Sequence, residues 1–87
     1  MKIIRIIAIW CSSCIVTYNK WLSVKEKHPN IEFVELDYDM DDIKSYNIGE
    51  VLPVTIFMND DKELSRIEGE FSEKDLERVI ENEKIDI

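Results

Sequence analysis

The chain has 87 residues, which leaves room for one domain spanning residues 1–87 and for no second core. Hydrophobic residues make up 45% of the chain and charged residues 34%, with only 2 glycines and 2 prolines, a composition that excludes disordered and collagen-like proteins. The net charge of −8 repels phosphate backbones and anionic headgroups, so we expect no binding to nucleic acid or to membranes.

The first third of the chain predicts a buried strand followed by an amphipathic helix. Residues 2–9 (KIIRIIAI) form an almost continuous β-branched run, which is typical of a central strand buried on both faces. Over residues 12–27, Ile15, Tyr18 and Leu22 recur at helical spacing, which predicts a helix with these residues on its apolar side. Lysines in the second half of this helix interact favourably with the negative end of the helix dipole, and Pro29 marks the end of the helix.

The rest of the chain predicts a second strand, a hairpin and a closing helix. Residues 31–38 (IEFVELDY) form a strand whose acidic side chains indicate an edge position. After a short helix at about residues 42–46, strands at 54–58 and 63–68 are joined by the turn-forming residues 59–62. Ser72 is the expected N-cap of a last helix, whose buried residues are Leu76, Val79 and Ile80.

The resulting order, βαβαββα, predicts an α/β fold. A strand, helix and strand at the start imply a parallel pair with a right-handed crossover, and the later hairpin adds an antiparallel pair. We therefore expect a four-stranded mixed sheet flanked by helices.

Two cysteines three residues apart, Cys11 and Cys14, are the candidate catalytic residues. Cys11 stands at the start of the expected helix, where free N–H groups and the positive end of the helix dipole stabilise a thiolate. Cys14 lies one turn further along, so its sulfur can reach Cys11 and close a disulfide. If Cys11 is accessible to solvent, it can attack a substrate disulfide, and Cys14 can resolve the mixed disulfide.

The cysteine pair is also compatible with two purely structural roles. A structural disulfide would close a loop of only about four residues and contribute roughly 2 kcal/mol in the loop-entropy model. A structural zinc site needs four ligands, whereas the chain offers two cysteines and His28, which stands at the far end of the same helix. We expect no bound metal and no bound cofactor.

The pattern Trp10-Cys11-Ser12-Ser13-Cys14 resembles the thioredoxin superfamily, and the resemblance extends over essentially the whole chain. Pro53 precedes the third strand, where the family has a cis-proline facing the active-site disulfide. Further matches are Leu36 and Asp39 near the end of the second strand, Tyr46-Asn47-Ile48, and Gly69, Ser72 and Leu76 at the last junction. The resemblance implies a thioredoxin-like fold with the strand order 2-1-3-4 and thiol–disulfide exchange as the activity.

The sequence departs from the family in three places. It starts directly with the strand that leads into the cysteine motif, so it resembles a minimal, glutaredoxin-sized version. Ser12 and Ser13 stand where thioredoxins have Gly-Pro and glutaredoxins Pro-Tyr, a dipeptide that tunes redox poise. The segment Gly69-Glu70-Phe71 lacks the glycine pair that helps glutaredoxins hold glutathione, which disfavours glutathione as the dedicated reductant.

The resemblance also implies a substrate-binding surface around Cys11. Pro53 forms one wall of this surface, and the backbone of Leu52 pairs with an extended substrate segment. Trp10, Ile48 and Leu52 form an apolar patch there, with the backbone at Gly69 and Glu70. We expect Trp10 to be partly exposed rather than packed in the core.

A further departure concerns charge. Arg5 occupies the position where thioredoxins keep a buried aspartate, and Glu35 falls where they keep a lysine near that aspartate. The two residues are therefore expected to meet on adjacent strands beneath the cysteines. Either the pair is an ordinary structural ion pair, or Arg5 favours the thiolate of Cys14 and Glu35 accepts a proton.

These observations predict a thiol–disulfide oxidoreductase that reduces protein disulfides, acts as a monomer and receives electrons from a partner disulfide reductase. Arg5 interrupts the apolar N-terminal segment and no small-residue cleavage site follows it, so we expect a cytoplasmic protein. The alternative is a non-catalytic thioredoxin-like module that docks on a partner through Leu52 and Pro53. In that case the cysteines serve only as a redox switch or a metal clip.

Overall fold

The computed structural model of the protein describes residues 2–83. Its elements are β1 (Lys2–Ile7), α1 (Ser12–Lys27), β2 (Glu32–Asp37), the 3-10 helix η1 (Lys44–Tyr46), β3 (Val54–Asn59), β4 (Lys62–Glu68) and α2 (Glu73–Glu83). Their order is the expected one. The strand β1 ends earlier than predicted because the chain turns there, with the N–H of Cys11 donating to the carbonyl of Ala8 at 3.1 Å.

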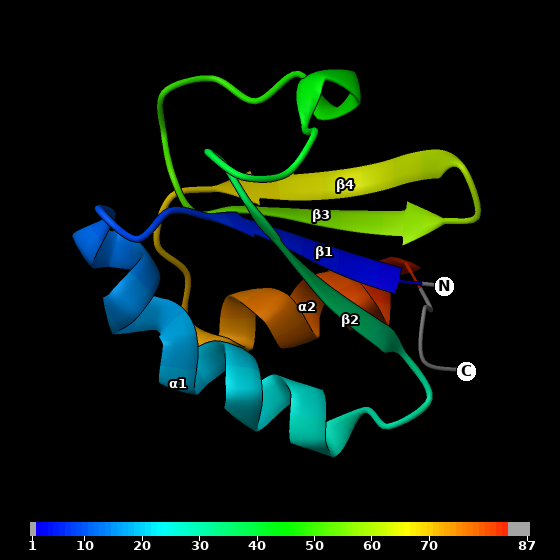
Figure 1. The fold of residues 1–87 in the computed structure, drawn as a ribbon. Helices are drawn as coiled ribbons and strands as arrows, with labels where there is room; N and C mark the ends of the chain where they lie inside the picture. Colours follow the sequence, from blue (N-terminus) through cyan, green and yellow to red (C-terminus); the bar gives the residue numbers. More distant parts are fainter. Residues whose placement is uncertain (1, 84–87) are drawn as a thin grey trace.

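The four strands form one mixed sheet in the order β2-β1-β3-β4 (Figure 1). The central strand β1 runs parallel to β2 and antiparallel to β3, and β4 pairs antiparallel with β3. In this register Arg5 lies opposite Glu35 on one side and opposite Thr55 on the other. The predicted sheet order is confirmed, as are the central position of β1 and the edge position of β2.

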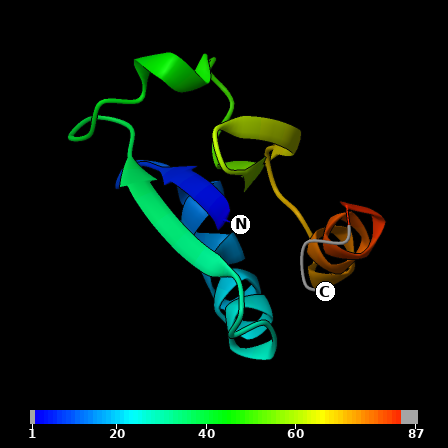
Figure 2. The same cartoon turned by 90° about the vertical axis from the view of Figure 1, so that its right-hand side faces the viewer.

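Both helices pack on one face of the sheet, and the segment between β2 and β3, which includes η1, lies over the other face (Figure 1 and Figure 2). The core on the helix side consists of Ile3, Trp21, Val24, Ile31, Phe57, Phe71, Leu76 and Ile80. The second buried cluster consists of Ile4, Ile6, Ala8, Cys11, Cys14, Leu52, Val54 and Ile56. Both cysteines therefore belong to a packed apolar cluster.

The helix α1 has the predicted bounds, but of the three residues of its predicted apolar side only Leu22 packs against the core. Ile15 is 71% exposed and Tyr18 is 44% exposed. The buried residues follow helical spacing along a different stripe and are Cys14, Thr17, Trp21 and Val24. The prediction was wrong because cysteine and threonine carry a weak apolar signal, whereas the stronger signal of isoleucine and tyrosine belongs to the solvent side.

The junction between β4 and α2 has the predicted turn and cap. Gly69 has a φ of +92°, in the left-handed region that favours glycine. The N–H of Asp75 donates to Ser72 Oγ at 3.1 Å, and the N–H of Ser72 donates to Asp75 Oδ2 at 2.9 Å. This reciprocal capping confirms Ser72 as the N-cap of α2. Neither α1 nor any other helix within residues 2–83 combines the length and the apolar character that a membrane crossing requires.

Candidate active site

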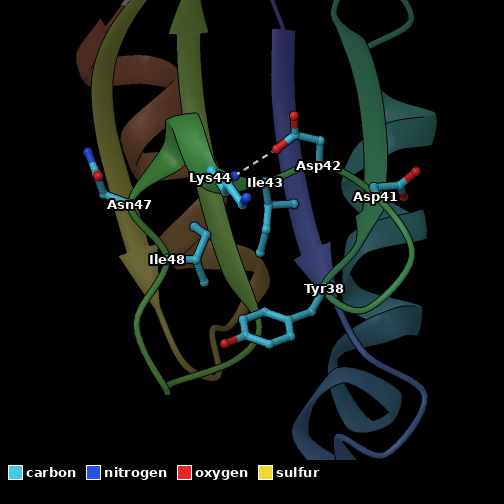
Figure 3. Close-up of a pocket in the computed structure, with 7 residues that line it drawn as sticks. All are labelled: Tyr38, Asp41, Asp42, Ile43, Lys44, Asn47 and Ile48. Carbon is cyan, nitrogen blue, oxygen red and sulfur yellow. Dashed lines mark hydrogen bonds between the residues drawn. The ribbon is translucent and has the colours of Figure 1, made fainter.

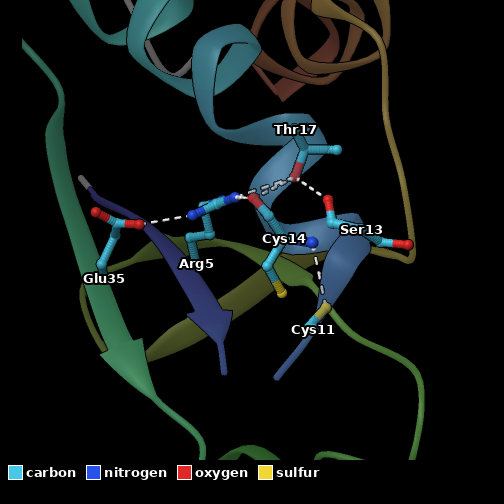
Figure 4. A network of polar contacts seen from close by, with 6 residues as sticks. All are labelled: Arg5, Cys11, Ser13, Cys14, Thr17 and Glu35. Atoms are coloured by element: carbon cyan, nitrogen blue, oxygen red, sulfur yellow. Dashed lines mark hydrogen bonds and ion pairs between the residues drawn. The ribbon is translucent and has the colours of Figure 1, made fainter. Parts of the chain in front are cut away.

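Cys11 closes the loop between β1 and α1 and caps the helix. Its backbone is extended, with φ −95° and ψ 107°, and its Sγ accepts a hydrogen bond from the backbone N–H of Cys14 at 3.2 Å (Figure 4). An acceptor at this position satisfies one of the N–H groups that the first helical turn leaves unpaired. The same N–H and the helix dipole stabilise negative charge on the Cys11 sulfur.

The two cysteines are unbridged and largely buried. Cys11 is 8% exposed and Cys14 is 4% exposed. The solvent access that attack by Cys11 requires is therefore met only in small part, because the cluster that includes Ala8 and Leu52 covers most of this residue. A substrate disulfide has to reach Cys11 through a small exposed fraction or displace neighbouring side chains.

The surroundings of Cys14 clearly oppose the ionisation of its thiol. Burial, followed by its side-chain hydrogen bond with Cys11, raises the pKa of the Cys14 thiol from 9.0 to about 11. A hydrogen bond with the backbone of Ala8 and the positive charge of Arg5 act in the opposite direction. Cys14 therefore stays protonated at neutral pH.

The segment before β3 contributes the second wall of the site. The peptide bond between Leu52 and Pro53 is cis, and the carbonyl of Pro53 accepts the N–H of Gly69 at 2.8 Å. Leu52 is only 8% exposed, so the expected contribution of its side chain to an exposed patch is wrong. The preceding residue, Val51, is the exposed apolar residue of this segment, with 54% of its surface accessible.

Trp10 lies on the surface, as predicted, with 61% of the residue exposed. Its Nε1 donates to Asp39 Oδ2 at 2.7 Å, and its ring meets Tyr38 edge to face at 6.0 Å. The large apolar residues that are exposed within residues 2–83 are Ile9, Trp10, Ile15, Val16, Tyr18, Met40 and Val51. Most of them come from the chain segments around Cys11 and Pro53, which gives this end of the molecule an apolar surface.

Three polar contacts of the site were not predicted from the sequence. Ser13 Oγ donates to Glu70 Oε2 at 3.0 Å, a contact between residues 57 positions apart that no local pattern indicates. Thr17 Oγ1 donates to the carbonyl of Ser13 at 2.8 Å and accepts a hydrogen bond from Arg5. The position of Thr17 on the buried side of α1 was the only feature of the sequence that could have indicated its two contacts.

The expected meeting of Arg5 and Glu35 is confirmed. Arg5 is 1% exposed, and its Nη1 lies 2.6 Å from Glu35 Oε2 on the neighbouring strand. Its Nη2 donates to the carbonyl of Cys14 at 2.5 Å, so the guanidinium lies directly beneath the first turn of α1 (Figure 4).

A separate cavity of about 500 Å³ lies in the segment between β2 and β3 and is lined by Tyr38, Asp41, Asp42, Ile43, Lys44, Asn47 and Ile48 (Figure 3). Its carboxylates accept backbone N–H groups: that of Lys44 donates to Asp42 at 3.2 Å and that of Asp37 to Asp41 at 2.7 Å. Across residues 2–83, His, Cys, Asp and Glu side chains form no group of three or more that could hold a metal ion.

Several solved structures that share this architecture are thioredoxins. A thioredoxin of Fasciola hepatica is 25% identical, with a TM-score of 0.84, over 93% of this chain and 78% of that one. Thioredoxin-2 of a malaria parasite is 19% identical, with a TM-score of 0.85, over 93% and 81%. A thioredoxin of Schistosoma mansoni is 23% identical, with a TM-score of 0.82, over 93% and 76%.

No curated protein matches the chain in sequence. The model of the thioredoxin family, in contrast, matches residues 1–82. This match includes both cysteines, Pro53 and all the elements of the sheet. The chain therefore belongs to the thioredoxin family.

Proposed function

We propose that the protein is a thiol–disulfide oxidoreductase that reduces protein disulfides, with Cys11 as the nucleophile and Cys14 as the resolving cysteine. The observation that carries this proposal is the position of Cys11 Sγ, which caps α1 and accepts the N–H of Cys14 at 3.2 Å. Membership in the thioredoxin family supports the same reaction. The segment at Pro53 and the exposed ring of Trp10 are the proposed substrate contacts.

The reaction proceeds in two exchanges. The Cys11 thiolate attacks one sulfur of a substrate disulfide, forms a mixed disulfide and releases the other substrate sulfur as a thiolate, which takes up a proton from solvent. Cys14 then loses its proton, attacks Cys11 Sγ and forms the Cys11–Cys14 disulfide. The second substrate sulfur leaves and takes up that proton, so two electrons have passed from the protein dithiol to the substrate disulfide.

The raised pKa of Cys14, about 11, suits this sequence of events. A protonated Cys14 does not compete with Cys11 for the substrate, because a thiol is a far weaker nucleophile than a thiolate. Its hydrogen bond with Cys11 keeps it close to the sulfur that it later attacks. A partner disulfide reductase in a reducing compartment such as the cytoplasm would restore the dithiol.

The limited exposure of Cys11, 8%, favours a second candidate function. A protein with an inaccessible dithiol could act as a non-catalytic interaction module, using the apolar surface around Trp10 and Val51 to dock on a partner. The two candidates differ in one measurable property, because only the oxidoreductase turns over.

The test is the reduction of a protein disulfide with dithiothreitol as the electron donor. The wild type should accelerate the reduction, and Cys11→Ser should abolish the acceleration. Cys14→Ser should form a stable one-to-one mixed disulfide at Cys11, which mass spectrometry detects. Ser45→Ala, an exposed change in η1, serves as the control that keeps full activity. Absence of both turnover and mixed disulfide with the wild type and Cys14→Ser would leave the interaction module as the function.

A further inference from the structure

A buried cation lies beneath the resolving cysteine. Arg5 is 1% exposed, and its guanidinium makes three polar contacts. It donates to the Cys14 carbonyl at 2.5 Å, to Thr17 Oγ1 at 3.0 Å and to Glu35 Oε2 at 2.6 Å (Figure 4). Two of these partners belong to the first turns of α1, and one belongs to the edge strand β2. Arg5 therefore connects the cysteine motif to the sheet.

The surroundings of this cation are otherwise apolar. The rings of Tyr18 and Trp21 lie 5.9 and 5.8 Å from the guanidinium carbon. Arg5 Nε and the hydroxyl of Thr55, which lies opposite Arg5 on β3, are buried without a hydrogen-bond partner within the described structure. Such burial is costly, and a well-packed apolar residue is often as stable or more stable at such a site. Fold stability alone therefore accounts poorly for an arginine at this position.

We propose that Arg5 is a positioning residue that shifts the equilibrium of the cysteine pair toward the dithiol, and that Glu35 sets the size of this shift by neutralising part of the charge of Arg5. The inference rests on the proposed redox function of Cys11 and Cys14. It concerns the equilibrium between the disulfide and the dithiol of these two cysteines, and it does not concern which of them is the nucleophile.

The physical reason is the difference in charge between the two redox states. Reduction adds two electrons and two protons to the neutral disulfide and yields two thiols, and the reduced form in which one sulfur has lost its proton carries a negative charge. A fixed positive charge next to the Cys14 backbone stabilises the state that carries the thiolate, whichever sulfur holds it, and leaves the disulfide unaffected. A buried site strengthens this interaction, because little water screens it. Arg5 therefore makes the protein disulfide easier to reduce.

Glu35 acts on this equilibrium through Arg5. Its carboxylate contacts the guanidinium on the side away from Cys14, so that Arg5 lies between them (Figure 4). This arrangement does not favour direct transfer of the Cys14 proton to Glu35, which the sequence had left open. The negative charge of Glu35 opposes the effect of Arg5, and its side chain, 35% exposed, is partly screened by solvent.

The experiment measures the equilibrium in which the protein disulfide and two glutathione molecules give the protein dithiol and glutathione disulfide, at pH 8. Arg5→Gln should lower the equilibrium constant about tenfold, which equals about 30 mV for a two-electron couple. Glu35→Gln should raise it, by about threefold, because it leaves the Arg5 charge unopposed. Arg5→Lys keeps the charge and should stay within about threefold of the wild type.

A second readout is the ionisation of Cys14 in the reduced protein, followed by thiolate absorbance. Its midpoint should move to higher pH in Arg5→Gln and to lower pH in Glu35→Gln. If the ion pair were merely structural, both variants would lose stability, and the midpoint of Cys14 ionisation would not move in opposite directions in the two variants. If Arg5→Gln fails to fold, Arg5→Lys and Glu35→Gln still test the charge argument.

Three control variants separate charge from packing. Thr55→Val alters the core next to Arg5 without changing charge and should leave the equilibrium constant unchanged. Arg66→Gln and Glu63→Gln remove the charges of an ion pair of the same type on β4, at 2.6 Å, and should also have no effect. The inference would be overturned if the equilibrium constants of Arg5→Gln and Glu35→Gln equalled that of the wild type, or if both changed in the same direction. Failure of the proposed function is distinguishable, because it appears as absent turnover while the glutathione equilibrium remains measurable.

Discussion

The buried Cys14 thiol should make the stability of the reduced protein fall at alkaline pH. Its pKa is raised from 9.0 to about 11 by burial and by the hydrogen bond with Cys11, so the folded state keeps the proton where the unfolded state has lost it. The protonated Cys14 thiol therefore contributes fully to the free energy of unfolding below pH 9, and this contribution is lost as the pH rises toward 11. For a shift of this size the loss is about 1 kcal/mol at pH 10 and about 2 kcal/mol at pH 11.

Urea unfolding of the reduced protein at pH 8 and pH 10, followed by tryptophan fluorescence, measures this loss. Other groups also titrate in this range, so the matched control is Cys14→Ala, which keeps every titratable group except the Cys14 thiol. The free energy of unfolding of the wild type should fall by about 1 kcal/mol more than that of Cys14→Ala between the two pH values. An equal fall in both proteins, or a smaller fall in the wild type, would refute the assignment of Cys14 as the buried protonated thiol.

Two further predictions concern the junction that brings the end of β4 to the site. Ser72→Ala removes the side-chain acceptor of the capping box and should lower the free energy of unfolding by about 1 kcal/mol, whereas Ser45→Ala should change it little. Gly69→Ala forces a side chain into a backbone with a φ of +92° and should cost about 1–2 kcal/mol in the same urea experiment. Gly49→Ala, where nothing lies within 4 Å of the added Cβ, is the control, and equal costs at the two glycines would contradict the reasoning.

Local patterns were sufficient for most of the fold. The β-branched run of β1 and the capping signal at Ser72 depend on neighbouring residues only, so the sequence indicates them directly. The contact between Arg5 and Glu35 was predicted from the resemblance to thioredoxins, in which these two positions are neighbours, and the parallel register of β1 and β2 places the two residues opposite each other. The cysteine motif also identified the candidate site. The chemistry of Cys11 depends on its position at the start of a helix, and the sequence predicts where that helix starts.

Features that depend on the packing of distant segments were not predictable in the same way. Ile15 and Tyr18 have the apolar character of core residues, yet they lie on the solvent side of α1, since Thr17 and Trp21 occupy the buried stripe. The burial of Leu52 depends on how the segment before β3 packs into the cluster with the cysteines. The contact of Ser13 with Glu70 requires the β4–α2 junction to approach α1, which no sequence spacing encodes.

The central claim is that Cys11, capping α1, is the reactive thiolate of the pair. The most direct test is to treat the reduced protein with limiting iodoacetamide at pH 7 and to map the modified cysteine by mass spectrometry over time. Because the pKa of Cys14 is raised to about 11, Cys14 should react slowly, and Cys11 should be alkylated at least about tenfold faster. Equal rates, faster modification of Cys14, or no reaction of Cys11 until the protein unfolds would contradict the account.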